Sequence, residues 1–143
     1  MNRYMIYTLK EILKKDSSPE IIGYIQEQMT ALIGYQINKN KLFELSCTTH
    51  NFVNLDDKLN ILGIIIVSSK SFLFDNNIFF IEILSSKNED PLIEQSLILK
   101  TIVYLQTIDN NCKIISFIDD VRIQNESLVP FGFFESHGIM VKL

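Results

Sequence analysis

The segment at residues 78–84, which reads IFFIEIL, constrains the fold of this chain more than any other stretch. Glu82 is its one residue that is not apolar. A nearly continuous apolar run of this length is typical of a central strand that is buried on both faces of a sheet. The segment therefore predicts a sheet that is covered by helices.

A long helix is predicted shortly after this strand. Asp90 is suited to the capping position, and Pro91 is suited to the first helical position. The apolar residues that follow are too many for one exposed stripe, so we expect this helix to pack against the sheet. Residues 109–111 (DNN) end the helix, and residues 113–118 are predicted to form another strand.

The first half of the chain predicts a short strand at residues 3–8, a helical turn at 9–15 and a short helix at 41–47. Between the last two lies a stronger helix start, where Ser17 is suited to cap the helix and Glu20 completes a capping box. The apolar residues that follow at helical spacing are Ile21, Ile25, Met29, Leu32 and Ile33.

A hairpin is predicted next. Residues 52–55 lead into a polar turn at 56–58, and residues 59–68 return with many β-branched side chains. A second polar turn at 75–77 separates residues 71–74 from the central strand. This alternation of strands and turns predicts a meander of neighbouring antiparallel strands.

The tail at residues 131–143 is predicted to supply one or two closing strands. The order of elements is then a strand, helices, a strand meander and a final strand-helix-strand unit. This order predicts an α/β (α+β) fold in which a mixed, mostly antiparallel central sheet is flanked by helices. A chain of 143 residues fits one domain, so residues 1–143 are expected to form a single domain.

Composition argues against several classes of partner. The net charge is −4 and the 13 basic residues are scattered, whereas a nucleic-acid site needs a basic face, so no nucleic-acid binding is expected. No apolar run is long enough to cross a bilayer, so no membrane association is expected. Cys47 and Cys112 form no paired motif and no secretory leader precedes them, which favours a cytoplasmic protein.

Three short features carry a resemblance to a known family. Residues 52–63 look like a hairpin that turns through charged residues and returns to a glycine, and residues 81–84 look like the end of a central strand before a cofactor loop. Asn125, followed by Gly132 and Phe133, resembles a late asparagine and a Gly-Phe pair before the last strand. In this order, and across nearly the whole chain, these features resemble the GNAT superfamily of N-acyltransferases.

The resemblance implies a GNAT-like fold and an acyl-CoA-dependent N-acyltransferase, with acetyl-CoA or another acyl-CoA as cofactor and a small-molecule or protein amine as acceptor. It implies that backbone groups at the splayed end of the central strand hold the pantetheine, and that amides of the next helix face the pyrophosphate. The implied cofactor-binding residues are Ile83, Leu84, Ser85, Leu92, Glu94, Gln95, Ser96 and Asn125. An exposed edge or tail strand of such a fold could support a homodimer.

Glu82 is the predicted catalytic base. Family members often use an acidic residue near this strand to take a proton from the amine that attacks the thioester. A carboxylate in so apolar a run would have its pKa raised by desolvation unless it is paired, which suits that role. The alternative is that Glu82 faces solvent or pairs with a lysine. Where many relatives have a tyrosine that protonates the departing thiolate, this chain has Leu128.

The cofactor loop is where this chain departs from the family. The family pattern is Arg/Gln-x-x-Gly-x-Gly/Ala, whose glycines let the backbone approach the pyrophosphate closely. Laid on that pattern, this chain has Pro91 at the Arg/Gln position, and Glu94 and Ser96 at the two small positions. No glycine lies between Gly63 and Gly132, so no shift of the alignment restores the motif.

The charge of this loop also opposes phosphate binding. The carboxylates of Glu89, Asp90 and Glu94 would repel a pyrophosphate, and Asp90 as a helix cap would occupy amides that should bind it. A second hypothesis therefore stays open: a degenerate GNAT-like domain without acyltransferase activity that acts as a binding or protein-interaction module.

Other groupings of polar residues predict little chemistry. Cys47 and His50 are three residues apart and could coordinate one metal ion, but two further ligands are not evident, so no metal site is predicted. The hydroxyls of Ser85 and Ser86 could contact a ligand at the end of the central strand. Tyr104 is predicted to be a packing residue.

Overall fold

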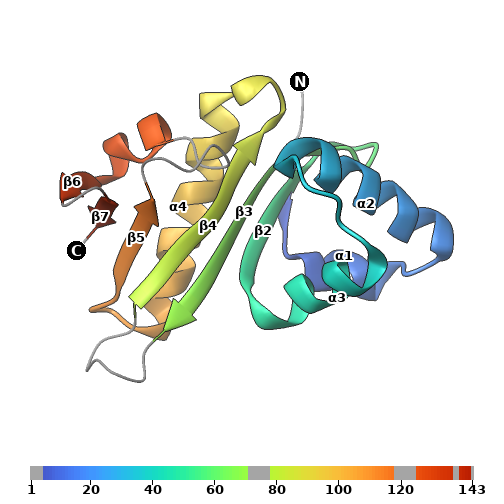
Figure 1. The fold of residues 1–143 in the computed structure, drawn as a ribbon, viewed down its shortest axis with the longest axis horizontal. Coiled ribbons are helices and arrows are strands. Elements are labelled where there is room, and N and C mark those ends of the chain that lie inside the picture. Colours follow the sequence, from blue (N-terminus) through green and yellow to red (C-terminus); the bar gives the residue numbers. More distant parts are fainter. Residues whose placement is uncertain (1–4, 71–77, 118–124, 137–138, 143) are drawn as a thin grey trace.

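The middle layer of the protein is a seven-stranded sheet with the strand order β1-β2-β3-β4-β5-β7-β6 (Figure 1). The computed structural model describes residues 5–70, 78–117, 125–136 and 139–142. Neighbouring strands are antiparallel except for β4 and β5, which are parallel. The strands are β1 (Met5–Tyr7), β2 (His50–Leu55), β3 (Ile61–Lys70), β4 (Ile78–Ser86), β5 (Lys113–Phe117), β6 (Phe134–Ser136) and β7 (Ile139–Lys142).

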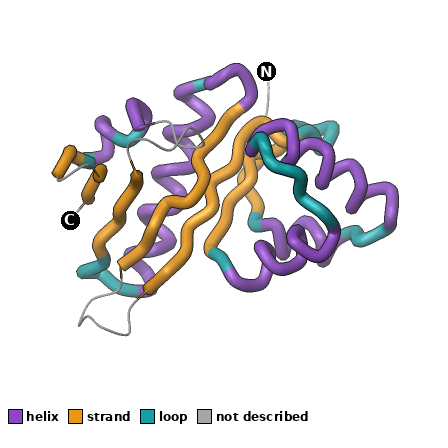
Figure 2. The backbone as a smooth tube through the Cα atoms, in the orientation of Figure 1, coloured by secondary structure: helices purple, strands orange, loops and turns teal. Residues whose placement is uncertain are grey.

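Helices cover both faces of this sheet. Three of them, α1 (Leu9–Lys15), α2 (Pro19–Ile33) and α3 (Lys39–Thr48), lie on one face, and α4 (Pro91–Ile108) lies on the other (Figure 2). Because α4 connects β4 to β5 as a crossover, these two strands run parallel. The predicted fold class is confirmed. Short 3-10 helices are η1 (Lys87–Glu89), η2 (Asn125–Ser127) and η3 (Val129–Phe131).

Strand β4 is buried on both faces, as the apolar run at 78–84 predicts. Ile81 and Leu84 belong to the core under α4, and their side chains are almost completely buried. Ile83 belongs to the second core, under α1 to α3. With β3 and β5 on its two sides, β4 is the central strand, and residues near its carboxyl end lie between the two helical layers.

The start of α2 differs from the prediction. The helix begins at Pro19, so Ser18 is the capping residue, and the Ser18 side chain makes no capping hydrogen bond. Glu20 then lies at the second helical position, so the predicted capping box with Ser17 is wrong. The buried residues of α2 are Ile22, Ile25, Met29 and Ile33, whereas Ile21 and Leu32 are half-buried.

The other predicted elements are found close to their expected ends. The hairpin is β2 and β3, residues 41–47 lie inside α3, and the tail supplies β6 and β7. Residues 71–74, the predicted turn at 75–77 and Ile118 lie outside the described residues.

Gly63 of β3 lies at a close contact between α4 and the sheet. A Cβ atom at this position would stand 2.6 Å from Cγ2 of Ile93 and 3.0 Å from Cδ1 of Leu97, both on α4. It would also stand 3.3 Å from the carbonyl oxygen of Ser85 on β4. The glycine that resembles the family hairpin therefore has a packing role, since it lets the helix lie against β3.

We expect Gly63→Ala to lower the free energy of unfolding by about 1–3 kcal/mol, because the added methyl group overpacks the contact with α4. Urea denaturation would measure the change. Gly23→Ala is the matched control, because a Cβ atom at Gly23 meets nothing within 4 Å and the residue lies inside α2. That control should gain about 0.5–1 kcal/mol. Equal effects at the two positions would contradict a packing role for Gly63.

Candidate functional site

A β-bulge interrupts the pairing of β3 with β4 at Glu82. Ile66 pairs with Ile83 and Val67 pairs with Ile81, which leaves Glu82 as an extra residue on β4. The alternation of side chains therefore breaks, and Glu82 and Ile83 both line the same groove on the α1 to α3 side of the sheet. The bulge thus directs a carboxylate and its neighbouring backbone toward that side.

The pairing of β4 with β5, its neighbour on the other side, ends next to the bulge at Glu82. The parallel pairing of β4 with β5 runs from Ile78–Lys113 to Ile81–Ser116. Beyond this point β4 continues to Ser86, whereas the described part of β5 ends at Phe117 (Figure 1). Within the described residues, 82–86 therefore have a strand partner only on the β3 side. Backbone N–H and C=O groups without a ladder partner are available to an extended ligand.

Glu82 lies in a groove of about 510 Å³, which we name the Glu82 groove. Its polar lining comes from β3, β4, α3 and the α2–α3 connection, and includes Tyr35, Gln36, Asn38, Lys41, Ser68 and Glu82. The Glu82 side chain is exposed, and Ser68 Oγ donates a hydrogen bond to its Oε1 at 2.8 Å. The expected burial of this carboxylate is therefore wrong, because α2 and α3 leave the sheet open here, and the alternative of a solvent-facing Glu82 is confirmed.

The N-terminus of α4 uses its own residues to satisfy its amides. Asp90 accepts a hydrogen bond from the N–H of Leu92 at 3.0 Å, as its predicted capping role requires. Pro91 has no N–H, and the N–H of Glu94 donates to the carbonyl of Asp90 at 3.2 Å. In the described structure this leaves the N–H of Ile93 as the uncommitted donor of the first turn.

The implied pyrophosphate contacts at Glu94, Gln95 and Ser96 need correction for this reason. These residues lie beyond the helical positions whose amides lack a partner inside the helix, so their N–H groups belong to the helical ladder. The N–H of Leu92, which the resemblance also assigns to the pyrophosphate, donates to the Asp90 carboxylate. Backbone amides of 94–96 cannot surround a phosphate while α4 is intact.

The Glu94 side chain is turned into the protein. It is 1% exposed, and its carboxylate accepts hydrogen bonds from the hydroxyls of Ser86 and Ser127. Burial raises the pKa of Glu94, the negative charges of Glu89 and Asp90 add to this effect, and the two serine hydrogen bonds oppose it. The carboxylate thus joins the end of β4, α4 and η2. The sequence alone indicates only a charge in the loop region.

The serine hydroxyls at the end of β4 have partners inside the protein. Ser85 Oγ donates to the carbonyl of Leu32 at 2.8 Å, which ties β4 to α2. Ser86 Oγ bonds to Glu94 and lies 3.3 Å from the carbonyl of Asp90. The hydroxyl protons of both serines thus point to acceptors inside the protein, and contact of these hydroxyls with a ligand stays a prediction. This part of β4 also offers backbone groups.

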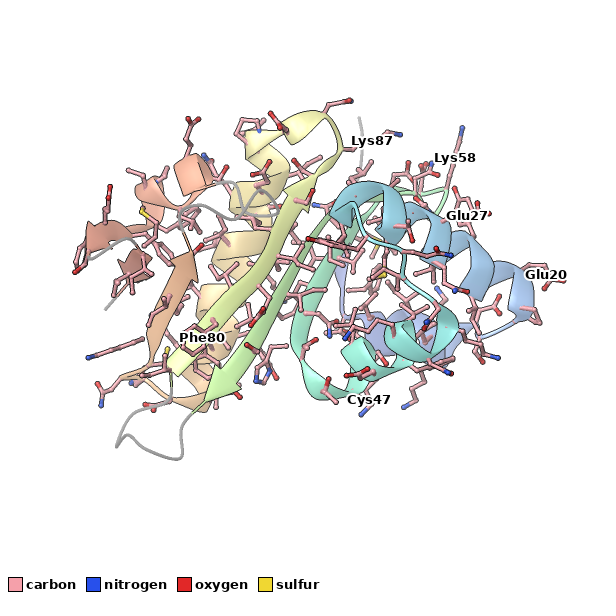
Figure 3. All side chains as sticks on the ribbon, in the orientation of Figure 1. Glu20, Glu27, Cys47, Lys58, Phe80 and Lys87 are labelled. Atoms are coloured by element: carbon pink, nitrogen blue, oxygen red, sulfur yellow. The ribbon has the colours of Figure 1, made fainter. Side chains whose placement is uncertain are left out.

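The connection from β4 to α4 makes its turn without glycine. Asn88 has φ 60° and Glu89 has φ 49°, in the left-handed region that favours glycine. Asparagine tolerates this conformation, whereas for glutamate it costs about 1–2 kcal/mol. The connection borders a second groove of about 450 Å³, to which Lys87 contributes a cation. Figure 3 shows Lys87 at this end of the sheet.

The late motif of the chain has mainly a structural role in the described part. Asn125 begins η2, after the end of β5. Leu128 is completely buried in the core under α4, and its aliphatic side chain has no proton to donate. Gly132 has φ 88° and Phe133 is 4% exposed, which makes the pair a turn glycine beside a core aromatic.

His50 and Tyr104 pack rather than form a reactive site. The His50 ring lies 5.5 Å from the ring of Tyr104 and 5.6 Å from that of Phe79. Burial lowers the pKa of His50. Cys47 is exposed near the end of α3 (Figure 3). Among the described residues, no three metal-ligating side chains lie together, and no helix could span a membrane.

No protein-family model matches the chain, and no curated protein matches it. Solved N-acetyltransferases nevertheless resemble its structure. An aminoglycoside N-acetyltransferase in complex with CoA has a TM-score of 0.70 at 11% identity, covering 96% of this chain and 91% of that one. A GNAT family acetyltransferase from Brucella melitensis in complex with acetyl-CoA has a TM-score of 0.64 at 14% identity, covering 99% and 88%.

An N-acetyltransferase from Staphylococcus aureus Mu50 has a TM-score of 0.66 at 11% identity, with 97% of this chain and 95% of that chain covered. At such low identity the likeness concerns the backbone arrangement. The mixed seven-stranded sheet, the helical layers on its two faces and these similarities lead to one conclusion about architecture. The chain has a GNAT-like α/β fold.

Proposed function

We propose that this protein is an acyl-CoA-dependent N-acyltransferase that transfers an acetyl or other acyl group to an amine. The observation that carries the proposal is the coincidence of two features at Glu82. The bulge in β4 turns Glu82 toward the groove, and among the described residues the backbone of Ile83 to Ser85 has a strand partner only on the β3 side. An extended pantetheine arm with its amides could pair with that backbone as a strand would.

Glu82 is the base in this proposal. The exposed carboxylate accepts the proton from the acceptor ammonium, and the neutral amine then attacks the thioester carbonyl carbon. The C–S bond breaks and an amide bond forms, the nitrogen gives up its second proton to solvent, and the CoA thiolate takes a proton from solvent. The one proton released overall is therefore the one that Glu82 accepted. The hydrogen bond from Ser68 holds one carboxylate oxygen, so the other oxygen can receive the proton. Leu128 takes no part in the proton transfer, because its side chain is aliphatic and packs in the core.

The nucleotide end of acyl-CoA fits this chain less well than the pantetheine end. The first turn of α4 offers the amide of Ile93, and the carboxylate of Asp90 occupies the neighbouring amide. Lys87 is the cation on the β4–α4 connection. We therefore propose that pantetheine contacts along Ile83 to Ser85 supply most of the affinity. The self-capped α4 also favours the second candidate, a binding module that does not transfer acyl groups.

Titration with acyl thioesters distinguishes the acyltransferase from the binding module. Acetyl-CoA at about a hundred times its dissociation constant should raise the free energy of unfolding by about 2.7 kcal/mol, seen as a rise in Tm. S-Acetyl-pantetheine, which lacks the nucleotide, should bind within about threefold of acetyl-CoA by calorimetry, since the α4 amides contribute little. If neither thioester binds at millimolar concentration, the acyltransferase proposal fails and the binding-module alternative is favoured.

A charge variant sharpens this measurement. Asp90→Asn keeps a side chain that caps helices well but removes the negative charge beside the Ile93 amide. It should tighten acetyl-CoA binding while leaving S-acetyl-pantetheine binding unchanged. If Asp90→Asn changes the affinities for the two ligands equally, the nucleotide of acetyl-CoA does not bind near the start of α4.

A further inference from the structure

The Glu82 groove carries two charged side chains of opposite sign on different walls. Glu82 belongs to β4, which forms the floor, and Lys41 belongs to α3, which forms a side. The other polar lining groups are amides and hydroxyls, among them Gln36, Asn38 and Ser68. A volume of about 510 Å³ is in the range of sites that hold small molecules. The groove therefore offers one anionic and one cationic contact to a single small ligand.

The ammonium of Lys41 is available to such a ligand. Its ion pair is with Glu44, one turn further along α3, at 3.8 Å. Both side chains are about half exposed, 49% and 60%, so water screens the pair and it contributes little. The N–H of Lys41 is capped by Asn38 Oδ1 at 2.8 Å, which fixes the start of α3 at the wall of the groove. A bound anion could replace Glu44 as the partner of this ammonium.

The carboxylate of Glu82 also has capacity for a ligand. Its Oε1 accepts from Ser68 at 2.8 Å, and its Oε2 has no partner in the described structure. A ligand ammonium can donate to Oε2 without breaking the bond to Ser68. The groove then holds both charges of a zwitterion, because each ligand charge meets a protein charge of opposite sign.

We infer that the acceptor is a small amine that also carries an anionic group, of the amino-acid type. This inference rests on the proposed acyltransferase function and names its acceptor class. The amine lies at Glu82, where it loses its proton, and the anionic group lies at Lys41. A polyamine is a poor acceptor, because its second ammonium would approach Lys41 with the same charge.

Matched acceptors test this inference. Amino acids and their carboxamides differ in the anionic group, and a linear diamine replaces that group with a cation. With acetyl-CoA as donor, kcat/KM should be at least about tenfold higher for an amino acid than for its carboxamide, because a charge-assisted contact is lost in the amide. The carboxamide amine is less basic and so more often unprotonated, which makes a preference for the acid a stringent result.

Lys41→Gln should abolish this preference, whereas Lys39→Gln should retain it. Lys39 is the matched control, because it lies on the same helix with its ammonium near the Phe43 ring rather than in the groove. If the carboxamide or the diamine is acetylated as well as the amino acid, the inference is overturned while the acyltransferase function stands. The inference is also overturned if Lys41→Gln keeps the preference.

A binding measurement decides the inference even if no acetyl transfer occurs. In an NMR titration of the protein without acyl-CoA, adding the amino acid should change the chemical shifts of Ser68 and Glu82. Adding the carboxamide should change them less. Those shifts should disappear in Lys41→Gln and persist in Lys39→Gln. In that case the groove binds the inferred class although the transferase proposal fails. If the amino acid shifts none of the groove resonances, the inference is overturned.

Discussion

Glu82→Gln is expected to lower kcat for acetyl transfer by about 10²–10³-fold, while acetyl-CoA binds within about twofold of its wild-type affinity. The glutamine amide has nearly the same shape and can still bond to Ser68, but it cannot accept a proton from the acceptor amine. The backbone groups of Ile83 to Ser85, which are proposed to hold pantetheine, are left in place. Steady-state kinetics and calorimetry measure the two quantities separately.

Glu27→Gln is the control for the loss of one surface carboxylate. Glu27 is exposed on α2 and lies outside the Glu82 groove (Figure 3). Its removal should leave kcat unchanged within about twofold. A Glu82→Gln variant with wild-type turnover would remove Glu82 as the base. A variant that loses acetyl-CoA binding instead would show that the carboxylate supports the fold of the bulge.

The arrangement of elements could be predicted from the sequence because it follows from local patterns. The apolar run at 78–84 indicates a strand covered on both faces, and β4 has that place. Asp90 and Pro91 indicate where α4 begins, and the helix starts at Pro91 with Asp90 as its cap. These signals depend on neighbours in the sequence, so no knowledge of the tertiary structure is needed.

The environment of Glu82 could not be predicted in the same way. Whether a residue in an apolar strand is buried depends on what covers its face, and here α2 and α3 leave a groove. The bulge is a matter of register between β3 and β4, since Ile66 and Val67 pair with residues two apart. Neither strand contains a glycine or proline at the bulge that would have indicated it.

The loop before α4 shows a second limit of sequence patterns. The absence of glycine indicates that the family turn cannot form, yet Asn88 and Glu89 adopt left-handed conformations. The sequence predicts that Glu94 repels a phosphate, but its side chain is buried. Its burial depends on Ser127, which is 33 residues away in sequence. Long-range contacts of this kind leave no local pattern.

Glu94→Ala is expected to lower the free energy of unfolding by about 2–4 kcal/mol. The substitution leaves a cavity between β4, α4 and η2, and it leaves the hydroxyl of Ser127 without its acceptor. Ser86 retains the carbonyl of Asp90 as a nearby acceptor. Urea denaturation at several pH values measures the loss, and the Gly23→Ala variant of α2 serves as a control that should not lose stability.

Glu94→Gln separates the charge of this side chain from its packing. Burial raises the pKa of Glu94 above its ordinary value of 4.5, so the native protein retains a proton that the unfolded chain releases. The stability from this group is complete below about pH 4.5 and is lost as the pH rises through the native pKa. Glutamine stays neutral, so the free energy of unfolding of the variant should increase relative to that of the wild type as the pH rises through the native pKa of Glu94.

The hydrogen bonds of the site allow this substitution. A glutamine amide can donate to Ser86 Oγ, which then donates to the carbonyl of Asp90, while the amide oxygen accepts from Ser127. The protonated carboxyl of Glu94 can make the same set, so glutamine imitates the acid form. Stability differences between Glu94→Gln and the wild type that do not change with pH would contradict a raised pKa. A loss as large as that of Glu94→Ala at every pH would show that the carboxylate itself, as an acceptor from both serines, holds the three elements together.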